Sequence, residues 1–426
     1  MRHRLSRRGG WSYQHRRDDL TRGVCADQPV YMLALDDPYP FYAQLRANDP
    51  VHRVDGSNFF LVSTWELVNE AVMRPGDFSS NLTASMVLDP DGGVSEFTMA
   101  PPGDPGHVLG TADDPVHAIH RKMVLPTVVA KRVRALEPLV NEAVERLWNE
   151  GLGADGSIDW VAAMANRLPM TLVSRLIGLP SVDMEWLVTG AYATAQMLDG
   201  AITPDQLKKA IAAATELAGY LAEQFAAARK DPGDNLLGDF ARHCNARELR
   251  PETAVIMLIQ LVSAGGESTA GLLGSSALTL AHREDIAAQL RGNMDLLPAF
   301  IEEVVRMESP FRGHYRHVLA DTELGGVDLA GGSHLLLLWG SANRDPAAFE
   351  APDELRLDRP SGKAHLGFGR GDHFCLGAAL ARLEAKTALT RLLSETRSIR
   401  ATEPPAWIPS VMVRRLQKLP LEVEVA

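Results

Sequence analysis

One cysteine stands in a short glycine-rich segment that could hold a metal. Residues 368–377 read FGRGDHFCLG, with Cys375 between glycines and a histidine two positions before it. The next residues, LGAALARLEAKTALTRLL, are strong helix formers. A thiolate at the start of a helix is stabilised by the helix dipole and by free backbone N–H groups. The chain has only three cysteines, so a disulfide framework does not explain this loop.

The surroundings of Cys375 favour haem iron over zinc. A thiolate without a nearby cysteine or histidine partner fits haem, because zinc is usually held by about four protein ligands. Gly369 and Gly371 permit backbone angles that other residues resist, and His373 could bond a haem propionate. Two alternatives stay open: a structural cysteine in a glycine-rich turn, and a nucleophile, although no obvious base is paired with it.

The segment resembles the haem-binding signature of the cytochrome P-450 superfamily, F-G-x-G-x-H-x-C-x-G, at every fixed position. The resemblance implies that Cys375 is the proximal thiolate ligand of haem b. It also implies a cofactor loop formed by Phe368, Gly369, His373, Cys375 and Gly377. The implied fold is the mainly α, triangular P-450 fold with small β-sheets.

A second segment, LVSAGGESTAGLLG from residue 261, lies within a long helical pattern. Adjacent glycines inside a helix cost about 1 kcal/mol each, which close approach of the backbone to a flat cofactor would explain. The segment resembles the family's distal motif, with a serine at the usual threonine position; serine lacks the methyl group that restricts the rotamer. The alternative is a solvent-facing glutamate beside a small-residue helix contact. The implied oxygen site and proton relay comprise Ala264, Gly265, Glu267, Ser268 and Thr269.

A glutamate–arginine pair follows in EEVVRMESP, where Glu303 and Arg306 lie three residues apart on one helix face. Such a pair is usually a surface salt bridge of little value. It matches the family's E-x-x-R motif, whose two residues join a later arginine, here Arg359. The implied role of this triad is structural.

Propionate-binding residues are implied at two further places. Arg316 matches the family's propionate-binding arginine, and DDPVHAIHRKMV resembles the D-P-P-x-H-x-x-x-R segment. His117 and Arg121 are four residues apart, so both reach one side of a helix and could donate charge-assisted bonds. His120 is a rival for His117, and a basic solvated face is the alternative.

Helical patterns at 129–150, 205–230 and 251–290 dominate the rest of the chain. Strand-like stretches occur at 51–63, at 314–340 and near the C-terminus, and residues 83–112 are expected to form one long loop. We therefore expect a single haem domain over residues 29–426. Residues 1–28 form a basic extension without the apolar core of a signal peptide, with a partner-binding or membrane-surface arm as the alternative.

The net charge of −11 argues against nucleic-acid binding. Scattered cysteines (Cys25, Cys244 and Cys375) indicate a reducing compartment, and no apolar run is expected to span a bilayer, so the expected location is the cytoplasm. The chain has no flavin or ferredoxin segment. Electrons are therefore expected from a ferredoxin and its reductase, with Lys122 and Arg370 as candidate docking residues.

The resemblance implies activation of dioxygen to hydroxylate or otherwise oxidise a hydrophobic small molecule. Oxidative coupling, peroxide use and a non-catalytic haem ligand-binding protein are the alternatives. A polar pair near the pocket could bind a substrate carboxylate or carbonyl, although contact with solvent or propionate is the plainer interpretation of Arg312 and His314. The expected pocket residues are Ile259, Val262, Phe311, Arg312, His314, Val411 and Met412.

Overall fold

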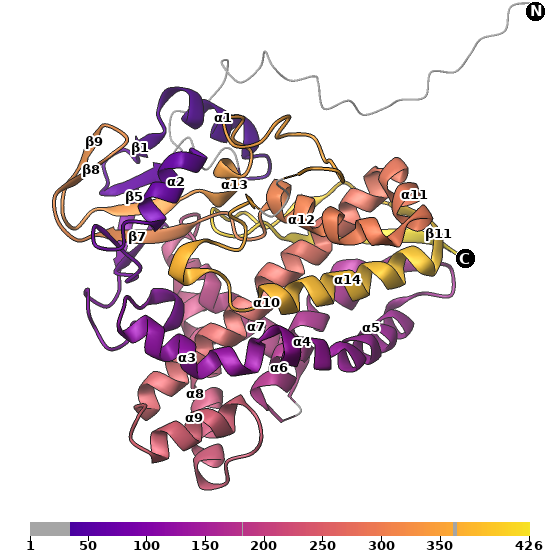
Figure 1. The fold of residues 1–426 in the computed structure, drawn as a ribbon, viewed down its shortest axis with the longest axis horizontal. Coiled ribbons are helices and arrows are strands. Elements are labelled where there is room, and N and C mark those ends of the chain that lie inside the picture. Colours follow the sequence, from indigo (N-terminus) through magenta and orange to yellow (C-terminus); the bar gives the residue numbers. More distant parts are fainter. Residues whose placement is uncertain (1–34, 181, 361–363) are drawn as a thin grey trace, which may run out of the picture.

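The computed structural model describes residues 35–180, 182–360 and 364–426 (Figure 1). The expected extension, residues 1–28, therefore lies outside the described residues. The α-helices are α1 (Tyr39–Asn48), α2 (Trp65–Val72), α3 (Val116–Val128), α4 (Ala130–Ala135), α5 (Glu137–Gly151), α6 (Arg167–Ile177), α7 (Met184–Gln196), α8 (Pro204–Lys230), α9 (Leu236–Asn245), α10 (Pro251–His282), α11 (Glu284–Gly292), α12 (Leu297–Glu308), α13 (Trp339–Ala342) and α14 (Ala378–Ser394).

The strands are short and lie mainly to one side of the helices (Figure 1). The largest sheet has the order β1-β2-β10-β7-β3, in which β10 is parallel to β2 and antiparallel to β7. The strands are β1 (Val51–Arg53), β2 (Phe59–Val62), β3 (Phe78–Ser79), β4 (Ala84–Leu88), β5 (Val94–Thr98), β6 (Ser157–Asp159), β7 (His314–Val318), β8 (Thr322–Leu324), β9 (Val327–Leu329), β10 (His334–Leu337), β11 (Thr396–Ala401), β12 (Ala406–Trp407), β13 (Leu416–Lys418) and β14 (Pro420–Val425). The expected mainly α fold with small sheets is confirmed.

Three expected boundaries are wrong. The 129–150 helix is split into α4 and α5, because Pro138 lies in the first turn of α5 and cannot continue a preceding helix. The 251–290 helix ends at His282, and α11 begins after Arg283. The long loop at 83–112 contains the hairpin β4–β5, whose turn is closed by a hydrogen bond from Asp89 N to Gly93 O.

Helix α10 runs through the middle of the molecule and packs against α6, α7, α8, α12 and α14 (Figure 1). By length and composition alone it is a candidate membrane span, which the sequence prediction did not identify. The sequence prediction counted uninterrupted apolar runs, whereas α10 mixes apolar residues with glycine, serine and threonine. The main core is a cluster of buried apolar residues, the first of which in the chain is Val108 and the last Val423. Because α10 contributes many residues to this core, its composition is weak evidence for a membrane span.

Candidate functional site

The cysteine loop is held by its own backbone. Cys375 N donates to Phe368 O at 2.8 Å, and Gly369 N donates to Leu366 O at 2.8 Å. Gly369 and Gly371 adopt φ angles of +69° and +67°, which favour glycine. The loop therefore brings Phe368 against the backbone of the cysteine and presents the thiol just before α14 begins.

The Cys375 side chain is exposed, yet it lies among enough protein atoms for burial to raise the pKa of its thiol. The thiol is therefore accessible although many protein atoms lie around it. Backbone N–H groups of Gly377 and Ala378 bond the sulfur and lower the pKa, as do the charges of Arg382 and Arg121. This donor set stabilises a thiolate, as the start of a helix should.

Positively charged and imidazole groups converge beside the loop. His314 and Arg316 are two residues apart on β7, so their side chains leave the same face of the sheet. Arg316 is buried, and burial lowers its pKa to about 10. His314 is exposed, yet the protein atoms around its ring and the charge of Arg316 lower its pKa to about 3, and Trp339 Nε1 donates to its Nδ1 at 2.7 Å.

Helix α3 supplies the other half of this cluster. The ring centroids of His117 and His373 are 4.0 Å apart, and Arg121 Nη2 donates to Phe374 O at 2.9 Å. Burial and the charges of Arg316, His117, His314 and Arg121 lower the pKa of His373 to about 3. His120, the rival of His117, is buried, and its Nδ1 has no hydrogen-bond partner among the described residues.

The cluster of basic and imidazole side chains on α3, β7 and the cysteine loop is suited to bind a negatively charged group. Asp113 is the acid whose charge acts on Arg316, and its carboxylate already accepts bonds from Ser79 Oγ and, at 2.8 Å, from Ser80 N. The excess of buried donors over carboxylates suits the two propionates of haem, and the nearby thiol suits its iron.

The predicted distal residues do not all face the same space. Ala264 is exposed and Ser268 partly exposed on α10, and Ser268 Oγ donates to Ala264 O at 3.1 Å. Thr269 is buried. Glu267 is 3% exposed, and its Oε1 accepts a bond from Arg415 Nε at 3.1 Å, whereas Oε2 has no partner among the described residues. Only Ser268 therefore presents its hydroxyl to accessible space.

Glu267 should make the stability of the protein depend on pH. Burial raises its pKa from 4.5 to about 7, against the lowering effect of Arg415, so the folded state holds a proton that the unfolded chain releases. The contribution of Glu267 to the stability of the folded protein therefore falls as the pH rises from 4.5 to about 7. Glu267→Gln cannot ionise and should gain stability relative to the wild type between about pH 5 and pH 8, by about 3 kcal/mol at most.

Thermal unfolding of both proteins at the two pH values measures this difference. Glu142→Gln, at an exposed position on α5, controls for the loss of one charge. An unchanged difference between Glu267→Gln and the wild type across the pH range would contradict the prediction.

The glycine pair of α10 makes a close contact with a neighbouring helix. A Cβ at Gly265 would lie 2.4 Å from Val173 Cγ2, and one at Gly266 would lie 2.4 Å from Met170 Cε. Both partners belong to α6. The glycines thus allow α6 and α10 to pack closely, which gives a reason for their presence beside the predicted approach to a flat cofactor.

Gly265→Ala should destabilise the protein by about 1–3 kcal/mol, because the new methyl group overlaps a β-branched side chain that cannot move aside. The double variant Gly265→Ala with Val173→Ala should recover part of that loss, since it makes room for the methyl group. Urea unfolding of the two variants and of Val173→Ala alone measures the coupling. Additive effects would show that this contact does not explain the glycine.

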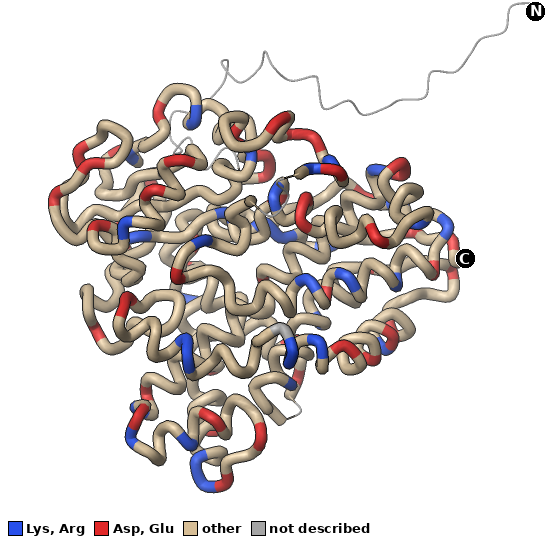
Figure 2. The backbone as a smooth tube through the Cα atoms, viewed as in Figure 1, with Lys and Arg blue, Asp and Glu red and all other residues tan. Residues whose placement is uncertain are grey.

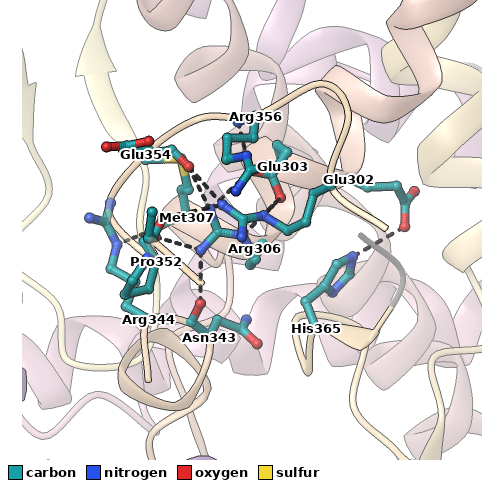
Figure 3. Close-up of polar contacts among 12 residues, drawn as sticks. Glu302, Glu303, Arg306, Met307, Asn343, Arg344, Pro352, Glu354, Arg356 and His365 are labelled. Atoms are coloured by element: carbon teal, nitrogen blue, oxygen red, sulfur yellow. Dashed lines mark hydrogen bonds and ion pairs between the residues drawn. The ribbon is translucent and has the colours of Figure 1, made fainter. Parts of the chain in front are cut away.

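The structure brings the predicted triad together, and Figure 3 shows two of its members, Glu303 and Arg306. Arg306 and Glu303, both at most 1% exposed, share two hydrogen bonds of 2.8 and 3.0 Å. Arg359 Nε donates to Glu303 Oε1 at 2.9 Å. Arg306 also donates to the carbonyls of Asn343, Pro352 and Glu354.

The predicted pocket residues differ in how deeply they are buried and in which core cluster they belong to. Val262 is fully buried in the main core, while Val411 and Met412 are buried in a second cluster beside the large sheet; Ile259 and Phe311 are only partly buried. Arg312 is 2% exposed and donates to Ser410 O at 2.5 Å and Leu35 O at 2.7 Å.

Both terminal nitrogens of Arg312 therefore bind backbone, which makes it a tie between two chain segments rather than a free anion-binding group. Sequence reasoning missed Arg415, Arg382 and Asp199, because their partners lie far away in the chain. Asp199 is buried and accepts a bond from Val411 N at 3.0 Å.

A thiol at a helix start, buried donors beside it and a long helix with accessible Ala264 and Ser268 together define a haem-thiolate protein. Residues 276–407 match the family model described as Cytochrome P450. The chain is 54% identical over 391 residues to Cytochrome P450 144 of Mycobacterium tuberculosis, which covers 92% of this chain and 90% of that protein. It is 33% identical to Cytochrome P450 monooxygenase PikC of Streptomyces venezuelae, over 94% of this chain and 96% of that protein. The chain belongs to the cytochrome P-450 family.

Solved structures agree with this assignment. CYP109E1 from Bacillus megaterium in complex with testosterone superposes with a TM-score of 0.82 at 27% identity, covering 92% of this chain and 99% of that one. P450BioI in complex with an acyl carrier protein ligated to hexadec-9Z-enoic acid also gives 0.82, at 25% identity, with coverages of 92% and 99%. The protein is thus a haem-thiolate monooxygenase that binds haem b, takes electrons from redox partners and transfers one oxygen atom of O2 to a substrate.

Proposed function

We propose that Cys375 supplies the proximal thiolate to haem b and that His117, Arg121, Arg316 and His373 bind its propionates. The observation that carries this proposal is the convergence of these buried and partly buried side chains beside an exposed thiol. Phe368, Gly369 and Gly377 shape the loop around the sulfur. When bound, haem supplies the activation of dioxygen.

Ser268 is the group that delivers protons on the distal side. Its hydroxyl donates to Ala264 O and lies on the accessible face of α10, so a small rotation of its side chain redirects the proton into the pocket. Glu267 lies next to it in the chain, and its pKa of about 7 lets it hold or release a proton near neutral pH. Thr269 supports this turn from the buried side.

The substrate is a hydrophobic small molecule. Phe311 and Ile259 are only partly buried, as residues beside a pocket should be, and the flanking Val411 and Met412 are apolar. A steroid and a carrier-bound fatty acid are named in the complexes of two structural neighbours. Either class is compatible with such a lining.

An acidic ferredoxin, reduced by its reductase, docks on α3, α4 and α14. Helices α3 and α4 contain no acidic residue, and the acid of α14, Glu384, is buried. Figure 2 shows the resulting band of Lys and Arg on the viewed face. Exposed basic residues there and on the cysteine loop are Lys122, Lys131, Arg132, Arg134, Arg370 and Lys386.

Apolar side chains lie within this basic surface. Ile119 and Phe374 are 52% and 42% exposed, and Met73 is 59% exposed with its sulfur near Gly371 of the cysteine loop. An apolar centre with a charged rim is the usual anatomy of a protein interface. Phe374 precedes Cys375 in the chain, so a donor protein that docks here comes close to the thiol.

Charge reversal tests the docking surface. Lys122→Glu and Arg370→Glu should slow reduction by an acidic ferredoxin about tenfold at low salt, and the difference should shrink as salt rises. Lys209→Glu, exposed on α8, is the matched control. Equal rates for all three variants would contradict this docking site.

The haem domain spans residues 29–426, and the protein works in the cytoplasm without a membrane span. The burial of much of α10 inside the fold supports this location. Fractionation of cells that produce the full chain tests it, since recovery in the membrane pellet would contradict it.

Titration of the purified ferric holoprotein tests the substrate class. The panel contains steroids, fatty acids, macrolides and aromatic cyclic dipeptides, and the Soret band is followed. A shift from low to high spin with one class identifies it as the substrate class. Binding only by charged, strongly polar compounds would contradict a hydrophobic substrate.

A further inference from the structure

Arg382 lies on α14, one helical turn after the residue that begins the helix. Its guanidinium carbon is 4.4 Å from the centroid of the Phe368 ring. Its Nε and Nη2 donate to Glu302 Oε1 and Oε2 at 2.6 and 2.9 Å. The arginine therefore has a fixed position between a carboxylate of α12 and an aromatic ring of the cysteine loop.

The same ring is tied to the cysteine, because Cys375 N donates to Phe368 O at 2.8 Å. Glu302 is 6% exposed and is also bonded by His365 Nε2 at 3.1 Å, a contact drawn in Figure 3. Among the charged side chains that act on the Cys375 sulfur, Arg382 has the largest effect. Glu302 binds this guanidinium through both carboxylate oxygens, and it is not among the main influences on the pKa of the thiol.

We propose that Arg382 and Glu302 are positioning residues that set the reduction potential of the haem through Cys375. This inference rests on the ligand role proposed above for Cys375. The electron that the donor protein supplies adds one negative charge to the thiolate-ligated centre. A cation held near the sulfur favours that added charge, and a carboxylate behind the cation limits its effect.

The two members of the pair should therefore have opposite effects. Arg382→Gln removes the cation and should lower the equilibrium constant for reduction about tenfold, whereas Glu302→Gln leaves the cation uncompensated and should raise it about tenfold. Arg382→Lys keeps the charge and should remain near the wild-type value, although the planar fork is lost. A merely structural role would not produce shifts of opposite sign.

Redox titration of the four holoproteins, with absorption of the reduced, carbon-monoxide-treated proteins, is the experiment. Arg391→Gln is the matched control, because Arg391 lies near the far end of the same helix and pairs with Glu395. Shifts of the same sign for Arg382→Gln and Glu302→Gln, or no shift, would overturn the inference. If Arg382→Gln fails to retain haem, the direction of the Glu302→Gln shift decides.

The wild-type spectrum separates the two proposals. If the carbon monoxide complex of the wild type lacks the thiolate signature, the ligand assignment itself is wrong. If the signature is present and the potentials of the variants do not move, only the role of the Arg382–Glu302 pair is wrong.

Discussion

Cys375→Ala should abolish the thiolate signature of the reduced carbon monoxide complex and all oxygen-dependent turnover, while the fold remains. The thiol is exposed, and the N–H groups of Gly377 and Ala378 bond its sulfur without depending on it for the helix. Removing an exposed thiol leaves no unpaired buried group, so unfolding should change by less than about 1 kcal/mol. Absorption of the carbon monoxide complex and circular dichroism measure the two effects.

A matched cysteine provides the control. Cys244 on α9 is buried, and burial raises the pKa of its thiol, which keeps it neutral and unreactive. Cys244→Ala should leave the spectrum unchanged and cost about 1 kcal/mol of stability through lost packing. A normal thiolate signature in Cys375→Ala would show that another group ligates the iron.

Contiguous motifs could be predicted from the sequence because their physics is local. The loop FGRGDHFCLG determines its own glycine conformations, the hydrogen bond between Cys375 and Phe368, and the start of α14. Glu303 and Arg306 share one helical turn, so their pairing follows from spacing alone. The family resemblance then supplied Arg359 as their partner.

Contacts between distant segments could not be predicted in this way. Arg415 is 148 residues from Glu267, and Arg382 is 80 residues from Glu302. The packing of α10, α12 and α14 decides which arginine pairs with each buried carboxylate. The residue pattern of a single helix does not predict this packing. The same reason explains why the partner of the Gly265 and Gly266 pair, helix α6, was missed.

The hairpin β4–β5 shows a different limit. Glycine, proline and aspartate between residues 89 and 106 suggested an irregular loop, although they occupy the turn between two five-residue strands and the segment after the second strand. Burial does not alternate along either strand, and such short strands give a weak signal beside the strong turn signal. The composition of residues 83–112 as a whole therefore did not predict the two strands.

Arg306→Ala should destabilise the protein by about 3–5 kcal/mol, because it leaves the buried carboxylate of Glu303 without its main partner. The variant also removes the donor to the carbonyls of Asn343, Pro352 and Glu354. Arg306→Lys should recover little of the loss, since one ammonium cannot reach these carbonyls and both carboxylate oxygens. Urea unfolding of the holoproteins measures the change.

The damage should extend to haem retention through a short hydrogen-bonded path. Asn343 accepts from Arg306, its side chain accepts from Leu366 N at 2.6 Å, and Leu366 O accepts from Gly369 N in the cysteine loop. Losing Arg306 should therefore loosen the loop that carries Cys375 and speed transfer of haem to an acceptor such as apomyoglobin. Arg283→Ala, whose partner Asp285 is exposed, should cost less than about 1 kcal/mol and leave haem transfer unchanged. If both arginine variants behaved alike, the buried triad would not be what positions the loop.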